Sequence, residues 1–194
     1  MPLTFANKIS IFRIISVPLF IASVMYYSPE RDFLRFVSLG IFLVAIITDV
    51  IDGHVARTRR QKTKAGAILD PIADKLLLIS AFICLYLVEG FPGQVRFPLW
   101  LVLIVTSRDA IILLGSGIIF LVQGHMEIAP TRWGKTTTFF QTLCIVGMLL
   151  QWSFSSYAWY LTVFFTVISG LGYIKRGFKI LNVADDKGTI RYTT

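Results

Sequence analysis

Long apolar stretches separated by short polar segments dominate the pattern of this 194-residue chain. A helix needs about 20 mostly apolar residues to cross a bilayer. Six stretches approach that length, over roughly 10–27, 33–56, 66–89, 97–122, 135–153 and 157–176. Turn-forming pairs such as Ser28-Pro29 and Ala129-Pro130 lie between the stretches. The pattern therefore predicts an all-α, polytopic membrane protein with six transmembrane helices, forming a single domain over residues 1–194.

The composition supports this membrane assignment. Hydrophobic residues make up 55% of the chain and charged residues only 15%, with a mean hydropathy of +0.71, which is typical of membrane proteins. The net charge of +8 could also suggest a nucleic-acid-binding protein. A water-soluble nucleic-acid-binding domain, however, would not carry this much uninterrupted apolar sequence. We therefore expect membrane lipids, and no nucleic acid, among the partners.

Lysines and arginines are distributed unevenly between the two sides of the predicted bundle. One side holds only Arg31, Arg35 and Arg96. The other side holds Lys8, Arg13, Arg57, Arg59, Arg60, Lys62, Lys64, Arg132, Lys135, Lys175, Arg176, Lys179, Lys187 and Arg191. Cytoplasmic segments carry such an excess, so both termini and the loop 57–65 are predicted to be cytoplasmic in a multi-pass protein of the cell (inner) membrane. The same basic face would attract anionic headgroups and phosphorylated substrates.

Acidic residues inside apolar helices indicate where chemistry occurs, because a carboxylate at membrane depth is costly. Asp49 and Asp52 are three residues apart, and Asp70 and Asp74 are four apart, so each pair shares one face of a helix. A hairpin through residues 57–65 would bring all four carboxylates together. Such a cluster repels itself unless it is protonated or neutralised by cations. Because hard divalent ions take oxygen ligands and bridge to phosphates, we expect a Mg²⁺ or Mn²⁺ site here.

Small and basic residues accompany these acids. Gly53, Ala56 and Gly66 would let helices or a bulky nucleotide approach closely, and Arg57 is placed to pair with a phosphate. Each feature alone has an ordinary explanation in helix packing or a solvated helix end. Together they define the residue at eight of twenty-six positions, as Asp49-x-x-Asp52-Gly53-x-x-Ala56-Arg57 and, after eight further residues, Gly66-x-x-x-Asp70-x-x-x-Asp74.

This combination resembles the signature of the CDP-alcohol phosphotransferase family at every defined position. The resemblance implies an enzyme that transfers the phosphatidyl group of CDP-diacylglycerol to an alcohol and releases CMP, and it favours a homodimer. It implies two Mg²⁺ or Mn²⁺ ions held by Asp49, Asp52, Asp70 and Asp74. Asp74 is also implied to be the catalytic general base for the acceptor hydroxyl. The implied CDP-binding residues are Asp49, Asp52, Gly53, Ala56, Arg57 and Gly66.

Flanking residues bear on the acceptor alcohol. Two elements resemble bacterial phosphatidylglycerophosphate synthases and the related cardiolipin synthases: Asn7-x-x-Ser10-x-x-Arg13, with Ser10 in place of threonine, and Gly134-Lys135-x-x-Thr138-x-x-Gln141. Ser169-Gly170-x-x-Tyr173 resembles the glycerophosphate enzymes. Arg108-Asp109 departs from the Arg-Glu pair common in the phosphatidylglycerophosphate synthases and is similar to the cardiolipin synthases. We expect glycerol 3-phosphate as acceptor. The alternatives are phosphatidylglycerol, as in a cardiolipin synthase, or the alcohol of another CDP-alcohol phosphotransferase.

The phosphate dianion of glycerol 3-phosphate needs cationic partners. The candidates are Arg108, Arg132 and Lys135, near the predicted cytoplasmic ends of the later helices. Arg108 is preferred because burying an unpaired arginine is expensive. The alternative for Arg108 is an internal ion pair with Asp109 or with an acid of another helix. Lys75 is expected to pair with the carboxylate cluster rather than with substrate.

Non-enzymatic functions explain the pattern less well. Intramembrane acids also mark ion pathways, so a divalent-cation transporter is the first rival. A transporter would favour acids near the midplane and repeated or broken segments, whereas these acids cluster beside a basic loop at one membrane face. A structural or scaffolding membrane protein would not need four converging carboxylates.

Overall fold

The structure is a computed structural model that describes residues 5–59, 64–89, 96–123, 132–152 and 155–191. Side chains are described within 11–48, 72–89, 96–117, 133–152 and 155–175. All regular structure in these segments is helical, which confirms the predicted all-α class. The helices are α1 (Phe5–Met25), α2 (Phe33–Arg59), α3 (Lys64–Leu87), α4 (Leu99–Gln123), α5 (Arg132–Leu149) and α6 (Ser155–Arg191), with a short 3-10 turn η1 (Pro29–Arg31).

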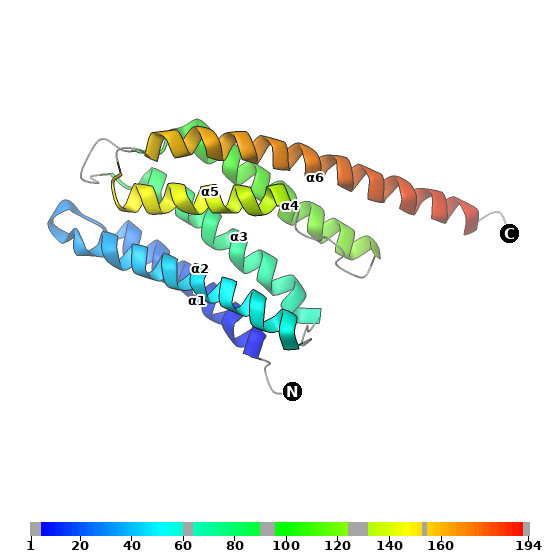
Figure 1. Cartoon of the computed structure of the whole chain (residues 1–194), viewed down its shortest axis with the longest axis horizontal. Coiled ribbons are helices and arrows are strands. Elements are labelled where there is room, and N and C mark those ends of the chain that lie inside the picture. Colours follow the sequence, from blue (N-terminus) through cyan, green and yellow to red (C-terminus); the bar gives the residue numbers. More distant parts are fainter. Residues whose placement is uncertain (1–4, 60–63, 90–95, 124–131, 153–154, 192–194) are drawn as a thin grey trace.

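Successive helices run in opposite directions along the molecule (Figure 1). Helices α1, α3 and α5 end, and α2, α4 and α6 begin, at the end that contains η1, which we call the η1 end. Toward the other end, α2 and α4 end, α3 and α5 begin, and the first and last helices have their free ends. We call this the α2–α3 end. The free ends of α1 and α6 therefore lie toward the same end of the bundle, as six helices of alternating direction require.

Helix α3 joins the two halves of the bundle. Helix α1 packs against α2 and α3, whereas α6 packs against α4 and α5. Helix α3 also contacts α4 and α5. Aromatic pairs lie at these contacts: the ring centroids of Phe20 and Phe42 are 5.8 Å apart, and those of Phe82 and Phe97 are 5.1 Å apart. In a bilayer such packing, rather than exclusion of water, holds helices together.

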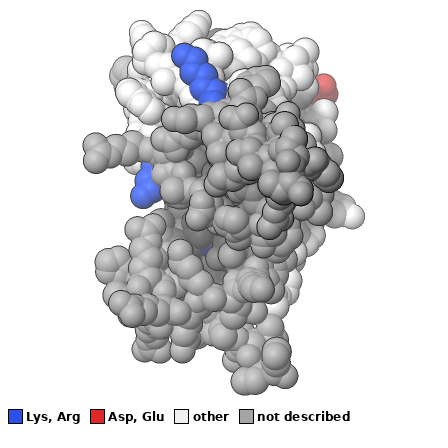
Figure 2. All heavy atoms as spheres, turned by 90° about the vertical axis from the view of Figure 1, so that its right-hand side faces the viewer, with Lys and Arg blue, Asp and Glu red and all other residues white. Residues whose placement is uncertain are grey.

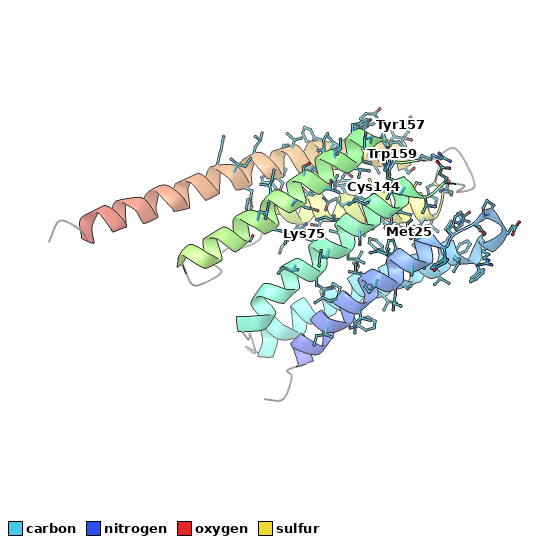
Figure 3. The ribbon with its side chains drawn as sticks, turned by 180° about the vertical axis from the view of Figure 1, so that it is seen from behind. Met25, Lys75, Cys144, Tyr157 and Trp159 are labelled. Atoms are coloured by element: carbon cyan, nitrogen blue, oxygen red, sulfur yellow. The ribbon has the colours of Figure 1, made fainter. Side chains whose placement is uncertain are left out.

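Large apolar side chains also cover the outside of the bundle. Leu114 of α4 is 68% exposed and Phe164 of α6 is 58% exposed. Tyr157 lies exposed at the η1 end, near Trp159 (Figure 3). Soluble monomers rarely expose apolar surface on this scale, whereas tyrosine and tryptophan favour the ends of membrane helices. The exposed surface therefore fits a protein surrounded by lipid.

Two described segments are long and apolar enough to cross a membrane, Leu99–Gly117 in α4 and Ser155–Lys175 in α6. Ile11–Met25 and Phe33–Thr48 are shorter apolar helical segments. The structure thus confirms six helices over the described residues, and length and composition support a membrane crossing for two of them. The six-span topology and its sidedness stay predictions.

Some predicted boundaries were wrong. Helix α1 begins at Phe5 rather than near 10, and α6 continues to Arg191 although its apolar stretch ends near 176. Hydropathy follows the part of a helix that suits a bilayer, not the whole helix. Residues 177–191 contain no proline, so the sequence holds none of the residues that most strongly break a helix. Helix α5 is shifted toward the N-terminus relative to the prediction and spans Arg132–Leu149.

Candidate active site

The residues of the Asp-rich signature lie on the two helices predicted to carry them. Helix α2 includes positions 49 to 57, and α3 includes positions 66 to 74. Of the signature side chains, the structure describes that of Asp74, which is partly buried. The predicted metal and CDP side chains that lie outside the described ones are Asp49, Asp52, Gly53, Ala56, Arg57, Gly66 and Asp70.

The backbone places the two acidic pairs at matching depths. Four residues join Arg59 to Lys64, so these helix ends lie within about 18 Å of each other, at the same end of the bundle (Figure 1). At 1.5 Å rise per residue, positions 52 and 70 lie about 9 to 10.5 Å along their helices from these ends. Positions 49 and 74 lie about 15 Å along. These similar distances from the two helix ends are compatible with a shared site, which stays a prediction.

The described charges visible at this end are mostly basic. Figure 2 views the molecule from the α2–α3 end. The described charged side chains visible there are lysines or arginines, except for an acidic side chain at the edge. Lys135 is exposed in the first turn of α5. The side chain of Arg132, at the start of the same helix, lies outside the described ones. Lysine and arginine side chains at this end favour phosphorylated ligands.

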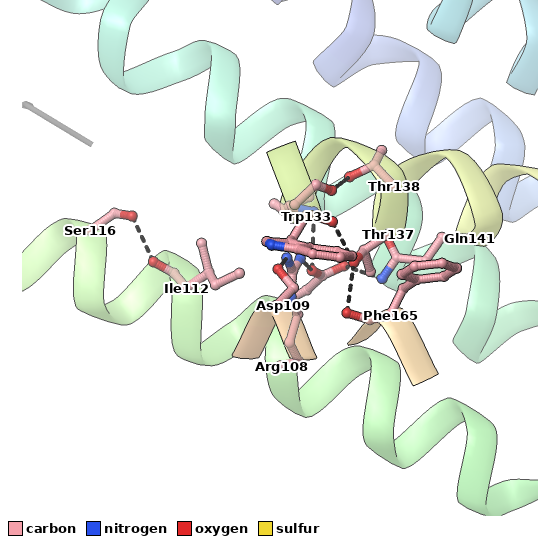
Figure 4. A network of polar contacts seen from close by, with 12 residues as sticks. Arg108, Asp109, Ile112, Ser116, Trp133, Thr137, Thr138, Gln141 and Phe165 are labelled. Carbon is pink, nitrogen blue, oxygen red and sulfur yellow. Dashed lines mark hydrogen bonds and ion pairs between the residues drawn. The ribbon is translucent and has the colours of Figure 1, made fainter. Parts of the chain in front are cut away.

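A group of buried polar side chains links four helices deeper in the bundle (Figure 4). Asp109 of α4 is fully buried and accepts a hydrogen bond from Arg108 Nη1 at 2.5 Å. It also accepts one from Gln141 Nε2 of α5 at 3.2 Å, and Lys75 Nζ of α3 lies 3.0 Å from its Oδ1. Arg108 Nη2 donates to the hydroxyl of Ser169 on α6. We call these five residues the interior charge cluster.

The interior charge cluster holds two cations, Lys75 and Arg108, and one carboxylate, Asp109. Their side chains are 11%, 7% and 0% exposed. A net positive charge at this depth is weakly screened and favours an anion nearby. Lys75 directly follows Asp74 and lies where α3 passes α4 and α5 (Figure 3). The cluster is therefore next to the predicted catalytic acid.

The Ser169-Gly170-x-x-Tyr173 element forms the contact between α6 and α4. Ser169 accepts the hydrogen bond from Arg108, and the Tyr173 and Ser116 hydroxyls are 2.8 Å apart. A Cβ added at Gly170 would lie 3.5 Å from Arg108 Cγ. The stem of the arginine thus packs directly over the glycine, and this element helps to hold Arg108 in place.

These contacts bear on the predicted acceptor residues. Arg108 makes an internal ion pair with Asp109, which was the alternative to binding the acceptor phosphate. Its two terminal nitrogens already have partners, in Asp109 and Ser169. Lys75 pairs with Asp109 of α4, whereas the sequence suggested the carboxylates of the signature. Gln141 entered the sequence analysis only through resemblance. A polar amide in an otherwise apolar helix was the available signal for it.

Comparison with known proteins defines the class. The CDP-alcohol phosphatidyltransferase family matches residues 3–168 of the chain. The chain belongs to this family, which favours an enzyme over a cation transporter. The family generally depends on divalent metal ions. Three of the four predicted ligands lie outside the described side chains, so the assignment of the metal ligands stays a prediction, made because carboxylates are the ligand type that hard cations take.

The relatives narrow the class. The chain is 31% identical to a probable phosphatidylglycerophosphate synthase of Mycobacterium tuberculosis, over 97% of this chain and 85% of the relative. It is 28% identical to CDP-diacylglycerol–glycerol-3-phosphate 3-phosphatidyltransferase of Bacillus subtilis, over 92% of this chain and 97% of the relative. A CMP-forming cardiolipin synthase of Streptomyces coelicolor is 30% identical over 71% of this chain and 60% of the relative.

Proposed function

We propose that the chain transfers the phosphatidyl group of CDP-diacylglycerol to sn-glycerol 3-phosphate, giving phosphatidylglycerophosphate and CMP. The observation that carries this proposal is the matched depth of the two acidic pairs on α2 and α3, in a chain of the CDP-alcohol phosphatidyltransferase family. Relatives of similar length named for this reaction support glycerol 3-phosphate as acceptor.

In this proposal the acceptor hydroxyl oxygen attacks the phosphorus of the phosphatidyl group, and the bond from that phosphorus to CMP breaks. Asp74 accepts the hydroxyl proton. Asp49, Asp52, Asp70 and Asp74 would hold two Mg²⁺ or Mn²⁺ ions, which would neutralise charge on the phosphate oxygens when bound. The residues assigned to the CDP moiety are Asp49, Asp52, Gly53, Ala56, Arg57 and Gly66.

Lys135 and Arg132 are assigned to the phosphate of the acceptor. Lys135 is exposed in the first turn of α5, the helix whose Gln141 reaches the interior charge cluster. Arg108 was the preferred candidate from the sequence, but its pairing with Asp109 and Ser169 favours indirect participation through the net charge of the cluster. A direct contact from Arg108 stays a prediction that kinetics can test.

The protein would cross the cell inner membrane six times as a single domain over residues 1–194, with both termini and the active site facing the cytoplasm. The excess of lysine and arginine at the α2–α3 end supports this orientation. A homodimer is proposed from the family resemblance.

The test is an acceptor panel with purified protein in detergent. With Mn²⁺ or Mg²⁺ and CDP-diacylglycerol, we expect CMP release with glycerol 3-phosphate, but not with phosphatidylglycerol, inositol phosphate or serine. Chelation of the metal should remove the activity. Asp70→Asn should abolish CMP release while the protein is still produced, and the matched variant Asp32→Asn, at the η1 end, should retain it.

The outcomes separate the alternatives. Turnover with phosphatidylglycerol alone would identify a cardiolipin synthase, for which the Streptomyces relative is the specific support. Full activity of Asp70→Asn, or activity that survives chelation, would contradict the proposed site.

A further inference from the structure

We infer that the interior charge cluster positions the catalytic acid: Asp109 holds Lys75, and Lys75 fixes the turn of α3 that carries Asp74. This inference rests on the proposed function, because it assigns Asp74 to the reaction. It gives Lys75, Asp109 and Gln141 a role that neither the Asp-rich signature nor the acceptor residues include. They are positioning residues, since they would act through Asp74 rather than on the substrate.

The geometry of Asp109 supports a fixed arrangement. Its carboxylate is fully buried and is contacted from two other helices, by Lys75 of α3 in an ion pair at 3.0 Å and by Gln141 of α5 at 3.2 Å, and by the neighbouring Arg108 of its own helix at 2.5 Å. The adjoining Arg108 is held in turn by Ser169 of α6. A carboxylate with partners on both oxygens has little freedom to rotate, so it is a rigid anchor for the lysine ammonium.

Lys75 transmits this restraint to the active site. Adjacent residues on a helix differ by about 100° in direction and 1.5 Å in height. Because the Lys75 side chain of α3 is ion-paired to Asp109 of α4, it restricts both the rotation of α3 about its axis and the movement of α3 along that axis. Asp74, one residue away, and position 70, one turn earlier, take their directions from that rotation. An error of about 1 Å in such a group can lower a rate a hundredfold.

Stability alone does not account for the cluster. Replacing buried charges with apolar side chains of similar volume is often neutral or stabilising. Counting the described side chains, the cluster also holds one more cation than carboxylates. Buried charges that stability does not explain are consistent with a role in orienting a neighbouring side chain. Residues that hydrogen-bond to metal ligands and fix their direction have such a role.

The test compares Lys75→Met with Lys75→Arg in the full-length enzyme. Lys75→Met leaves the Arg108–Asp109 pair balanced, so the protein should fold and keep its thermal midpoint in detergent. We expect kcat to fall about tenfold to a hundredfold, with KM for glycerol 3-phosphate changed less than about twofold. More metal should be needed for half-maximal activity. Lys75→Arg, which can still reach a carboxylate, should recover a large part of kcat.

Two further variants test the residues of the cluster on α5 and α4. Gln141→Leu should lower kcat in the same direction but less, and Asp109→Glu should retain more activity than any neutral substitution, because it keeps the carboxylate. The control Asp32→Asn should leave kcat and both KM values unchanged.

Three outcomes would overturn the inference. The first is a folded Lys75→Met enzyme with unchanged kcat and metal requirement. The second is a rise in KM for glycerol 3-phosphate with kcat intact, which would make the cluster an acceptor contact. The third is a Lys75→Arg enzyme no more active than Lys75→Met. Absence of wild-type activity with every acceptor would instead reject the proposed function, so the two failures are distinguishable.

Discussion

Two ion-pair clusters in this bundle differ in how their charges balance. At the η1 end, Arg35 of α2 donates to Asp32 at 2.9 Å and to the carbonyl of Leu149, at the end of α5, at 3.2 Å. Asp32 also accepts a hydrogen bond from the Tyr27 hydroxyl at 3.3 Å. This outer cluster pairs one cation with one carboxylate, and the Asp32 side chain is 40% exposed. It supplies a donor to a helix end that lacks one, so the fold alone explains it.

The interior charge cluster has no such explanation. Its two cations share one carboxylate, none of the three side chains is more than 11% exposed, and Asp109 lies inside a helix rather than at its end. The Lys75, Asp109 and Gln141 members lie near the middle of their helices, where there is no helix end to cap. This difference between the clusters agrees with the positioning role inferred above.

The largest difference between the two clusters is expected when the Asp109 carboxylate is removed. Asp109→Asn leaves Lys75 and Arg108 buried without an anionic partner, and uncompensated buried charge costs about 3–5 kcal/mol. We expect a large drop in the thermal unfolding midpoint of the detergent-solubilised protein, followed by tryptophan fluorescence. Lys75→Met removes the excess cation, so it should be close to neutral in the same measurement.

A large loss of stability in Asp109→Asn with little loss in Lys75→Met is the result that the proposed charge balance requires. Equal losses of stability in Asp109→Asn and Lys75→Met would mean that both cations are needed to balance the cluster. The excess positive charge would then have a further acidic partner within the protein.

The sequence predicted the features that belong to single helices. Hydropathy gave six helices because lipid-facing and core-facing positions are both apolar, and the spacing of Asp49 with Asp52 and of Asp70 with Asp74 placed each pair on one helix face. The matching depths then followed from the four-residue connection and the constant rise of a helix. The helix ends in water were predicted poorly, as at Arg191, because hydropathy does not follow them.

Contacts between helices could not be predicted in the same way. Asp109 could have met the signature acids' metal ions, the acceptor or another helix, and which of these occurs depends on how α3, α4 and α5 are rotated about their axes. The partners Lys75 and Gln141 come from two of these helices. Sequence spacing within one helix carries no information about that rotation, which depends on packing across the whole bundle.

An intermediate effect is expected at Lys135. A charge-assisted hydrogen bond to a phosphate is worth about 1.5–3 kcal/mol, so Lys135→Ala should raise KM for glycerol 3-phosphate about tenfold to a hundredfold. KM for CDP-diacylglycerol and the unfolding midpoint should stay close to wild type, because the side chain is exposed. Parallel losses for both substrates would remove Lys135 from the acceptor site.

Measuring kcat and KM for glycerol 3-phosphate in Arg108→Lys distinguishes the role of Arg108 from that of Lys135. A lysine keeps the charge but cannot reproduce both the Asp109 and the Ser169 contacts of the guanidinium. We expect a lower kcat with little change in KM for glycerol 3-phosphate. A selective rise in that KM would restore Arg108 as a direct contact to the acceptor phosphate.

The smallest effect belongs to the outer cluster. Partly exposed ion pairs contribute about 0.2–1 kcal/mol, so Asp32→Asn should lower the unfolding midpoint by at most about 4 °C. Because Asp32 lies at the η1 end, away from the signature acids, kcat should not change. If Asp32→Asn lowered kcat as much as Lys75→Met does, any disturbed ion pair in the bundle would slow the enzyme. The contrast between a structural pair and a positioning cluster would then be lost.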